Sequence, residues 1–203
     1  MKGIVILLTL ILQTLGTSAW SEGSLEIGVA VPPLTLITAT GNSFQLAAAA
    51  RGQWTVLAYL RGSWCPYANR QLKEFRRLEE PLMQRGGTII AIAPDSPRQL
   101  LTKVVELELG LVLLSDDVFD AARSFGILER LPPGEAAPFL KARANMIPLG
   151  RDEGYLVPQA AVWLIDPDGK VAAAWKRERG AGFIEADALM RELERLRVLR
   201  PSP

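Results

Sequence analysis

Short, continuous apolar runs divide this chain into segments of strand length. Four of them are apolar on both faces and cover residues 54–60, 88–93, 111–114 and 160–165. Such runs are typical of strands in the interior of a sheet that carries helices on both sides. A shorter run at 34–38 predicts one more strand.

The segment that follows residue 65 has the three- and four-residue spacing of an amphipathic helix. Its apolar stripe consists of Leu72, Phe75, Leu78 and Leu82. A proline inside a helix removes a backbone hydrogen bond, so we expect Pro81 to kink or break this helix. The glycine pair at 86–87 is expected to end it.

Three further helices are predicted from their end signals. Ser96 is placed to cap a helix that begins with a proline and ends at Gly110. Residues 115–117 are polar and are expected to cap a helix that closes at Gly126. Residues 184–199 form an amphipathic pattern and predict a C-terminal helix.

Turn residues connect several of these elements. The segment 40–43 predicts a turn, and 44–50 is either a short strand or one helical turn. Residues 166–169 read Asp-Pro-Asp-Gly, with glycine at the position that needs a positive φ. This turn predicts a hairpin that joins the strand before it to an antiparallel partner at 170–175.

The stretch 128–157 contains several prolines and has no clear period, so we expect a mostly irregular surface insertion with one helix near 136–144. Elsewhere strand and helix alternate, and the chain ends with a hairpin and a helix. This order predicts an α/β protein, a thioredoxin-like fold with a central mixed β-sheet flanked by helices, in a single domain over residues 20–203.

The composition excludes several classes of enzyme and binding site. The chain of 203 residues has a net charge of +1, no histidine and one cysteine. Without histidine there is no Cys-His or Ser-His hydrolase and no imidazole metal site, and one cysteine does not make a structural zinc site. No glycine-rich phosphate loop is present, and the balanced charge gives no reason to expect a nucleic-acid partner. We therefore expect no cofactor and no metal.

The first residues have the layout of an export signal. Lys2 supplies a positive start, residues 3–15 are mostly apolar, and 17–19 (Thr-Ser-Ala) is a small-residue cleavage site. We expect residues 1–19 to be removed and the mature protein to be periplasmic or secreted, without stable membrane association. An uncleaved anchor is the alternative, although the apolar core is short for a bilayer span.

Cys65 is the residue around which we expect the chemistry to be organised. It follows the strand at 54–60 and precedes Pro66, which suits the first position of a helix. A thiol at a helix N-cap faces free backbone N–H groups and the positive end of the helix dipole, and both favour the thiolate. Arg61 is close enough in sequence to add positive charge. The alternative is a cysteine that packs as a small apolar side chain.

Four stretches resemble a known family: residues 60–67 (LRGSWCPY), 91–97 (AIAPDSP), 124–127 (SFGI) and 162–170 (VWLIDPDGK). They resemble the peroxiredoxin-like branch of the alkyl hydroperoxide reductase and thiol-specific antioxidant (AhpC/TSA) family, in the thioredoxin superfamily. The similarity runs in order over about residues 28–198. It implies a thioredoxin fold and a cysteine, Cys65, that attacks peroxides or disulfides.

The chain departs from the family pattern at three positions. Ala68 stands where related sequences carry the second, resolving cysteine of a Cys-x-x-Cys motif. Ala160 stands where thioredoxin folds carry a cis-proline, and Pro158 matches a neighbouring position. Gly62 occupies the position, three residues before the cysteine, where typical peroxiredoxins have threonine or serine, and Ser63 is one residue out of register.

The resemblance implies a thiol-dependent antioxidant oxidoreductase, which reduces hydroperoxides through one cysteine. Cys65 is the expected nucleophile, and Arg61 and Ser63 are candidate donors that polarise the peroxide. The residues expected to surround them are Trp64, Pro66, Tyr67, Ala68 and Ala160.

The absence of a second cysteine defines the expected partners. A hydroperoxide or disulfide is the substrate, and an external thiol or a dithiol protein must reduce the oxidised cysteine. Two alternatives stay open at this point. One is a redox-inactive thioredoxin-fold binding protein, and the other is a thiol–disulfide oxidoreductase that lacks its resolving cysteine.

Overall fold

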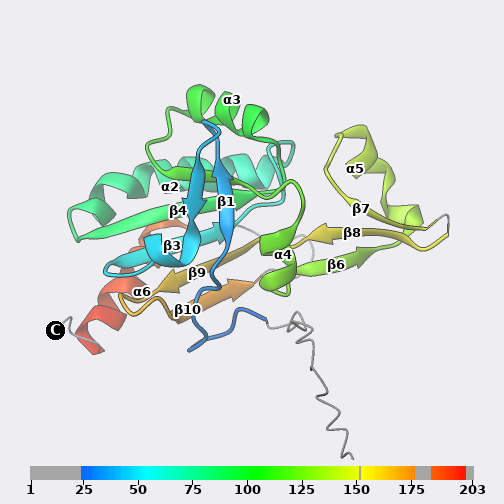
Figure 1. Cartoon of the computed structure of the whole chain (residues 1–203). Helices are drawn as coiled ribbons and strands as arrows, with labels where there is room; N and C mark the ends of the chain where they lie inside the picture. Colours follow the sequence, from blue (N-terminus) through cyan, green and yellow to red (C-terminus); the bar gives the residue numbers. More distant parts are fainter. Residues whose placement is uncertain (1–23, 151, 177–183, 200–203) are drawn as a thin grey trace, which may run out of the picture.

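The computed structural model describes residues 24–150, 152–176 and 184–199, so the predicted export signal lies outside the described residues. A seven-stranded sheet forms the centre of the molecule (Figure 1), in the order β10 (Val171–Lys176), β9 (Ala161–Ile165), β3 (Trp54–Tyr59), β4 (Gly87–Ala93), β5 (Val112–Ser115), β1 (Thr35–Thr38) and β2 (Ser43–Gln45). The helices around it are α1 (Leu46–Ala49), α2 (Pro66–Met83), α3 (Pro97–Leu107), α4 (Asp120–Ser124) and α6 (Ala186–Leu199).

Strand β3 lies inside this sheet because both of its neighbours pair with it along its length. It runs parallel to β4, with Tyr59 opposite Ile92, and antiparallel to β9, with Tyr59 opposite Ala161. All six residues of β3 are buried, as its continuous apolar run predicts. The predicted mixed sheet flanked by helices is confirmed.

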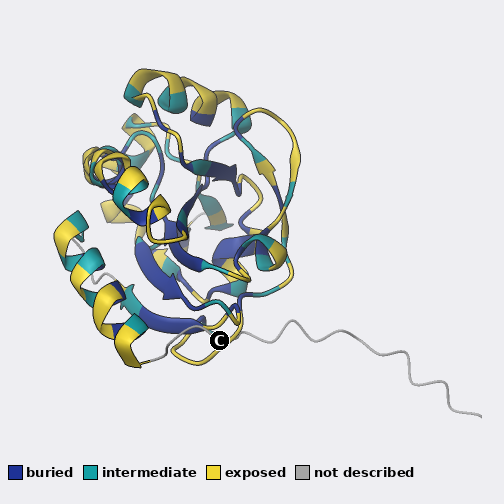
Figure 2. Ribbon diagram, turned by 90° about the vertical axis from the view of Figure 1, so that its left-hand side faces the viewer, coloured by how far each residue is buried: buried dark blue, intermediate teal, exposed yellow. Residues whose placement is uncertain are grey.

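Successive residues of β3 supply two separate hydrophobic cores, since side chains alternate between the faces of a strand. Val56 and Ala58 pack on the face covered by α2, α3 and α6. Leu57 and Tyr59 pack on the opposite face, against α1 and α4. Figure 2 shows the buried strands enclosed by helices whose outer sides are exposed.

Two predicted helix ends differ from the structure. Pro81 does not break α2, which continues to Met83; the proline lacks one N–H donor, and only two helical residues follow it. Helix α3 has the predicted cap, with Ser96 and Gln99 forming a reciprocal capping box. It ends at Leu107, and Glu108 takes the left-handed C-cap conformation at φ +50° in place of Gly110.

Residues 128–150 and 152–158 contain a second, three-stranded antiparallel sheet, so the expectation of a mostly irregular segment is wrong, whereas the helix expected near 136–144 is present. Its order is β6 (Leu128–Leu131), β8 (Gly154–Pro158) and β7 (Ile147–Gly150), with a 3-10 turn at Pro133–Glu135 and helix α5 at Ala137–Lys141. Strands β6 and β7 are short and only partly buried, which hides their period in the sequence. We call this unit the arm, and it projects from one side of the main sheet in Figure 1.

The predicted hairpin at 166–169 joins β9 to β10 as an antiparallel pair. Gly169 has a φ of +79°, and the Asp166 carboxylate accepts the N–H groups of Asp168 and Lys170. Within the described residues, no helix is both long and apolar enough to span a bilayer.

Candidate active site

Cys65 lies at the junction of the central strand β3 and helix α2. Its backbone is extended (φ −85°, ψ 121°), and it is the N-cap of α2, with Pro66 at the first helical position. The Cys65 N–H donates to the Gly62 carbonyl at 3.1 Å, and the Cys65 carbonyl accepts the Asn69 N–H at 3.1 Å. The predicted placement at a helix start is confirmed.

The thiol itself is buried. Cys65 is 2% exposed and belongs to the hydrophobic core on the α2 face of the sheet. Its sulfur makes no capping hydrogen bond, although we expected it to face the free amides of the first turn. In the conformation described here the thiol is therefore close to the helix start but covered by its neighbours.

Asp95 holds the loop that leads to the thiol. It follows β4, is 6% exposed, and accepts two hydrogen bonds from Ser63: the N–H at 2.8 Å and the hydroxyl at 2.6 Å. The Ser63 hydroxyl thus donates to a carboxylate instead of pointing to a substrate. The sequence analysis did not include Asp95 among the site residues. It follows the apolar run of β4, which pairs in parallel with β3, so the two strands end side by side.

Gly62 is required by the shape of this loop. Its φ of +126° lies in the region that favours glycine. A Cβ at this position would lie 2.7 Å from Trp64 Nε1 and 3.3 Å from an Asp95 carboxylate oxygen. The Trp64 indole therefore occupies the space in which the threonine or serine expected from the family resemblance would stand.

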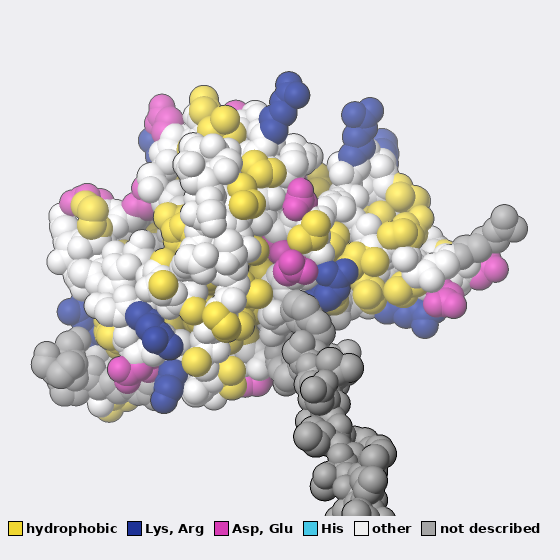
Figure 3. All heavy atoms as spheres, in the orientation of Figure 1, with side chains coloured by type: hydrophobic (Ala, Val, Ile, Leu, Met, Phe, Trp, Pro, Cys, Tyr) yellow, Lys and Arg dark blue, Asp and Glu magenta, His cyan; other side chains and the backbone are white. Residues whose placement is uncertain are grey.

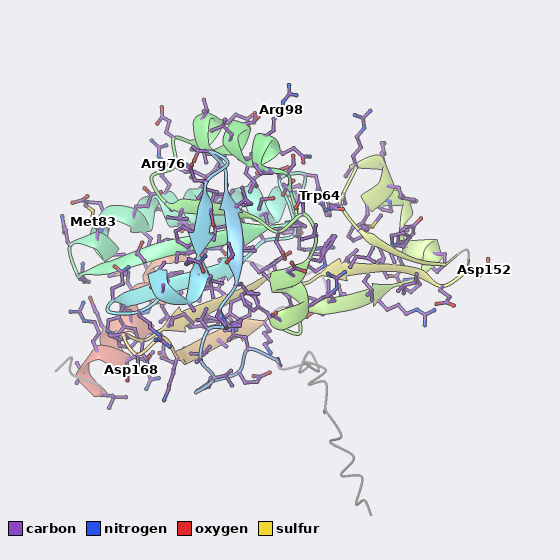
Figure 4. All side chains as sticks on the ribbon, in the orientation of Figure 1. Trp64, Arg76, Met83, Arg98, Asp152 and Asp168 are labelled. Atoms are coloured by element: carbon purple, nitrogen blue, oxygen red, sulfur yellow. The ribbon has the colours of Figure 1, made fainter. Side chains whose placement is uncertain are left out.

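Arg61, near the start of this loop, lies against two aromatic rings. Its guanidinium carbon is 5.6 Å from the Trp64 ring centre and 5.0 Å from that of Phe139, which belongs to α5 of the arm. The two rings meet edge to face at 5.2 Å. Figure 4 shows Trp64 at the boundary between the main sheet and the arm. Phe139 was not predicted, because only the tertiary fold brings α5 to this loop.

Two polar atoms near the thiol are buried without a hydrogen-bond partner among the described residues. They are Trp64 Nε1 and Asn69 Oδ1. The Asn69 amide nitrogen donates to the Ser63 carbonyl at 3.0 Å, so Asn69 also supports the loop.

The other predicted surrounding residues take different positions. Tyr67 is 52% exposed and Pro66 is exposed, whereas Ala68 is buried in the first turn of α2. Ala160 directly precedes β9, beside the end of β3 as the β3–β9 register continues. No cis peptide bond occurs in the described parts of the chain.

A buried acid lies on the opposite side of the sheet. Tyr59 donates to the Asp116 carboxylate at 2.8 Å, and the same carboxylate accepts the N–H groups of Ala121 and Ala122 at the start of α4. Burial raises the pKa of Asp116 and, together with the nearby charge of Asp116, raises that of Tyr59 well above its usual value. The capping role predicted for residues 115–117 is carried by Asp116.

On the face drawn in Figure 3, basic and acidic side chains are interspersed. Among the residues that the structure describes, no group of three or more His, Cys, Asp or Glu side chains is placed to hold a metal ion.

A thioredoxin-type sheet with a cysteine at the start of the helix after its central strand defines a class of thiol proteins. Within this class the chain belongs to the AhpC/TSA family, whose pattern matches residues 27–174. No curated protein matches the chain by sequence.

Solved structures share the fold at low sequence identity. A mutant of PrxQ from Xylella fastidiosa has a TM-score of 0.69 and 16% identity, covering 86% of this chain and 98% of its own. The bacterioferritin comigratory protein of Xanthomonas campestris has a TM-score of 0.65 and 22% identity, covering 85% and 97%. Peroxidoxin BcpB from Mycobacterium tuberculosis has a TM-score of 0.66 and 20% identity, covering 87% and 99%. Membership of this family supports an enzyme of the thiol peroxidase or oxidoreductase class.

Proposed function

We propose that this protein is a one-cysteine peroxidase that reduces hydroperoxides through Cys65. The observation that carries the proposal is the position of Cys65, the one cysteine of an AhpC/TSA chain, at the N-cap of α2 after the central strand. The structurally similar protein of Xanthomonas campestris is described by its alkyl peroxide reduction activity, which supports the same chemistry here.

The reaction uses the Cys65 thiolate, the hydroperoxide, a proton for the leaving oxygen and an external thiol as reductant. The Cys65 thiolate attacks one peroxide oxygen, the O–O bond breaks, and the leaving alkoxide takes up a proton and departs as an alcohol. Cys65 is then a sulfenic acid. A first external thiol condenses with it to a mixed disulfide and releases water, and a second thiol restores Cys65 and leaves as a disulfide.

The surrounding residues fit a small substrate. Arg61 supplies positive charge at the loop that carries the thiol, where its guanidinium lies against the Trp64 ring. Ser63 holds the loop through Asp95. A disulfide substrate is larger and would have to displace the groups that cover a thiol that is 2% exposed.

A redox-inactive binding protein is the second candidate. The burial of Cys65, the missing cap hydrogen bond and the alanines at positions 68 and 160 favour it. The thiol–disulfide oxidoreductase ranks third, because Ala68 leaves a mixed disulfide with no internal thiol to resolve it.

Peroxide consumption by the purified protein separates these functions. Wild type with dithiothreitol is expected to consume hydrogen peroxide or cumene hydroperoxide in excess of the protein, and Cys65→Ser is expected to lose all of this activity while keeping its fold. Dimedone should label Cys65 after one equivalent of peroxide. A folded wild-type protein with neither turnover nor a dimedone adduct would leave the binding function in its place.

A further inference from the structure

The arm contacts the loop that carries the thiol through one residue and two neighbouring loops through another. Phe139 of α5 packs against the Arg61 guanidinium at 5.0 Å and against the Trp64 ring at 5.2 Å. Asn145, six residues further on, donates its amide hydrogens to the carbonyls of Pro94 and Asp117, both at 2.9 Å. The arm is thus attached to the loops that follow β3, β4 and β5.

These contacts connect the arm to the two residues that directly precede Cys65. Pro94 precedes Asp95, whose carboxylate holds Ser63, and Ser63 and Trp64 are the two residues before Cys65. Within the described chain, no carboxylate forms an ion pair with Arg61. The Arg61 guanidinium is instead in contact with the Trp64 and Phe139 rings. Because an aromatic face attracts a cation, these two rings orient the guanidinium.

We propose that the arm positions Arg61 at the loop that carries Cys65, and that Phe139 is the positioning residue through which it acts. The guanidinium lies against both the Phe139 and the Trp64 ring, which also contact each other, and Asn145 holds α5 in the place this arrangement needs. The site for an anionic or polar reactant at Cys65 is then completed by a segment about seventy residues away in the sequence. The placement of Arg61 does not depend on the proposed function. Only its expected effect on the rate of peroxide reduction rests on that function.

The rate of Cys65 alkylation measures the placement of Arg61 without any need for turnover. Iodoacetate is an anion and iodoacetamide is its neutral analogue, so the ratio of their rates reports positive charge at the thiol. Phe139→Leu keeps an apolar side chain against the arm's core but removes the aromatic face, and it should lower this ratio about threefold. Phe139→Tyr should restore it, and Leu140→Ala, an exposed neighbour on the same helix, should leave it unchanged.

A double-mutant cycle tests whether Phe139 acts through Arg61. Arg61→Ala should lower the alkylation ratio at least as far as Phe139→Leu, and the double variant should be no lower than Arg61→Ala alone. Asn145→Ala should lower the ratio in the same direction, since it releases α5. If the enzyme turns over peroxide, Phe139→Leu and Arg61→Ala should reduce kcat/KM by similar factors, again without adding.

Two outcomes would overturn the positioning role. One is an alkylation ratio that is unchanged in Phe139→Leu, and the other is a double variant whose loss equals the product of the two single losses. Urea unfolding of each variant confirms that the comparison is made between folded proteins. A wild type that does not reduce peroxide but shows the predicted ratios would refute the proposed function and leave the role of the arm intact.

Discussion

Removal of the Asp95 carboxylate is expected to destabilise the protein and to expose its thiol. Asp95 accepts two short hydrogen bonds from Ser63, at 2.8 and 2.6 Å, and a hydrogen bond to a charged group contributes about 1.5–3 kcal/mol. Asp95→Ala deletes both and leaves the Ser63 N–H without this acceptor. We expect a loss of about 2–4 kcal/mol in the free energy of unfolding, allowing for relaxation of the loop.

Two matched variants separate the contributions of the two bonds. Ser63→Ala removes only the hydroxyl bond and should cost about 1–2 kcal/mol. Asp95→Asn can keep both bonds, because its amide oxygen can accept the Ser63 N–H while its amide nitrogen donates to the turned hydroxyl. It loses the charge and should cost less than Asp95→Ala. The double variant of Asp95→Ala with Ser63→Ala should cost little more than Asp95→Ala alone.

Urea unfolding followed by tryptophan fluorescence measures these losses. With a denaturant dependence of about 2 kcal/mol per molar urea, a loss of 2–4 kcal/mol lowers the midpoint by about 1–2 M. Iodoacetamide should also alkylate Cys65 faster in Asp95→Ala, since the loop that covers the thiol opens more often. An Asp95→Ala midpoint equal to that of wild type, or fully additive losses in the double variant, would refute the reasoning.

Three further predictions concern other parts of the chain. Ala68→Cys places a second sulfur in the first turn of α2, one helical turn from Cys65, and should allow an internal disulfide that thioredoxin-type dithiols reduce. Mass spectrometry after peroxide treatment should show the loss of two hydrogens from this variant. Persistence of both free thiols would contradict the prediction. Burial raises the pKa of Asp116, so the folded chain keeps this proton to a higher pH than the unfolded chain, and the stabilisation from Asp116 falls as the pH rises from the ordinary value of 3.8 through the raised one. The advantage of wild type over Asp116→Asn in the free energy of unfolding should therefore be larger near about pH 3.5 than near about pH 7, and a gap that widens with pH would be inconsistent with this sign. Export predicts that the protein recovered from its native cell begins near Trp20, and an intact Met1 in a cytoplasmic fraction would disprove it.

The order of the elements could be predicted from the sequence because it depends on local pattern. The apolar runs at 54–60 and 88–93 are buried on both faces, as is typical of interior strands in a sheet covered by helices. The positions of Cys65 and Ser96 at helix starts follow from the prolines after them, whose fixed φ and missing N–H suit the first helical turn. The turn at 166–169 could be predicted because Gly169 stands at the position that needs a positive φ.

The arm and the surroundings of the thiol were decided by the tertiary structure. The strands of the arm pair with each other, and β6 and β7 are only partly buried, so their residues lack the continuous apolar pattern of an interior strand. Phe139 and Asp95 reach the Cys65 loop from segments that are distant in sequence, and their importance depends on a ring distance and on two hydrogen bonds. No local propensity encodes such contacts.

Gly62 shows how the two sources of information combine. The sequence alone reveals that a glycine stands where the family resemblance leads one to expect a hydroxyl side chain. The structure gives the reason, since the backbone there has a φ of +126° and the Trp64 indole fills the space that a Cβ would need. A residue type can be read from the chain, but the volume available to it is set by side chains that only folding brings together.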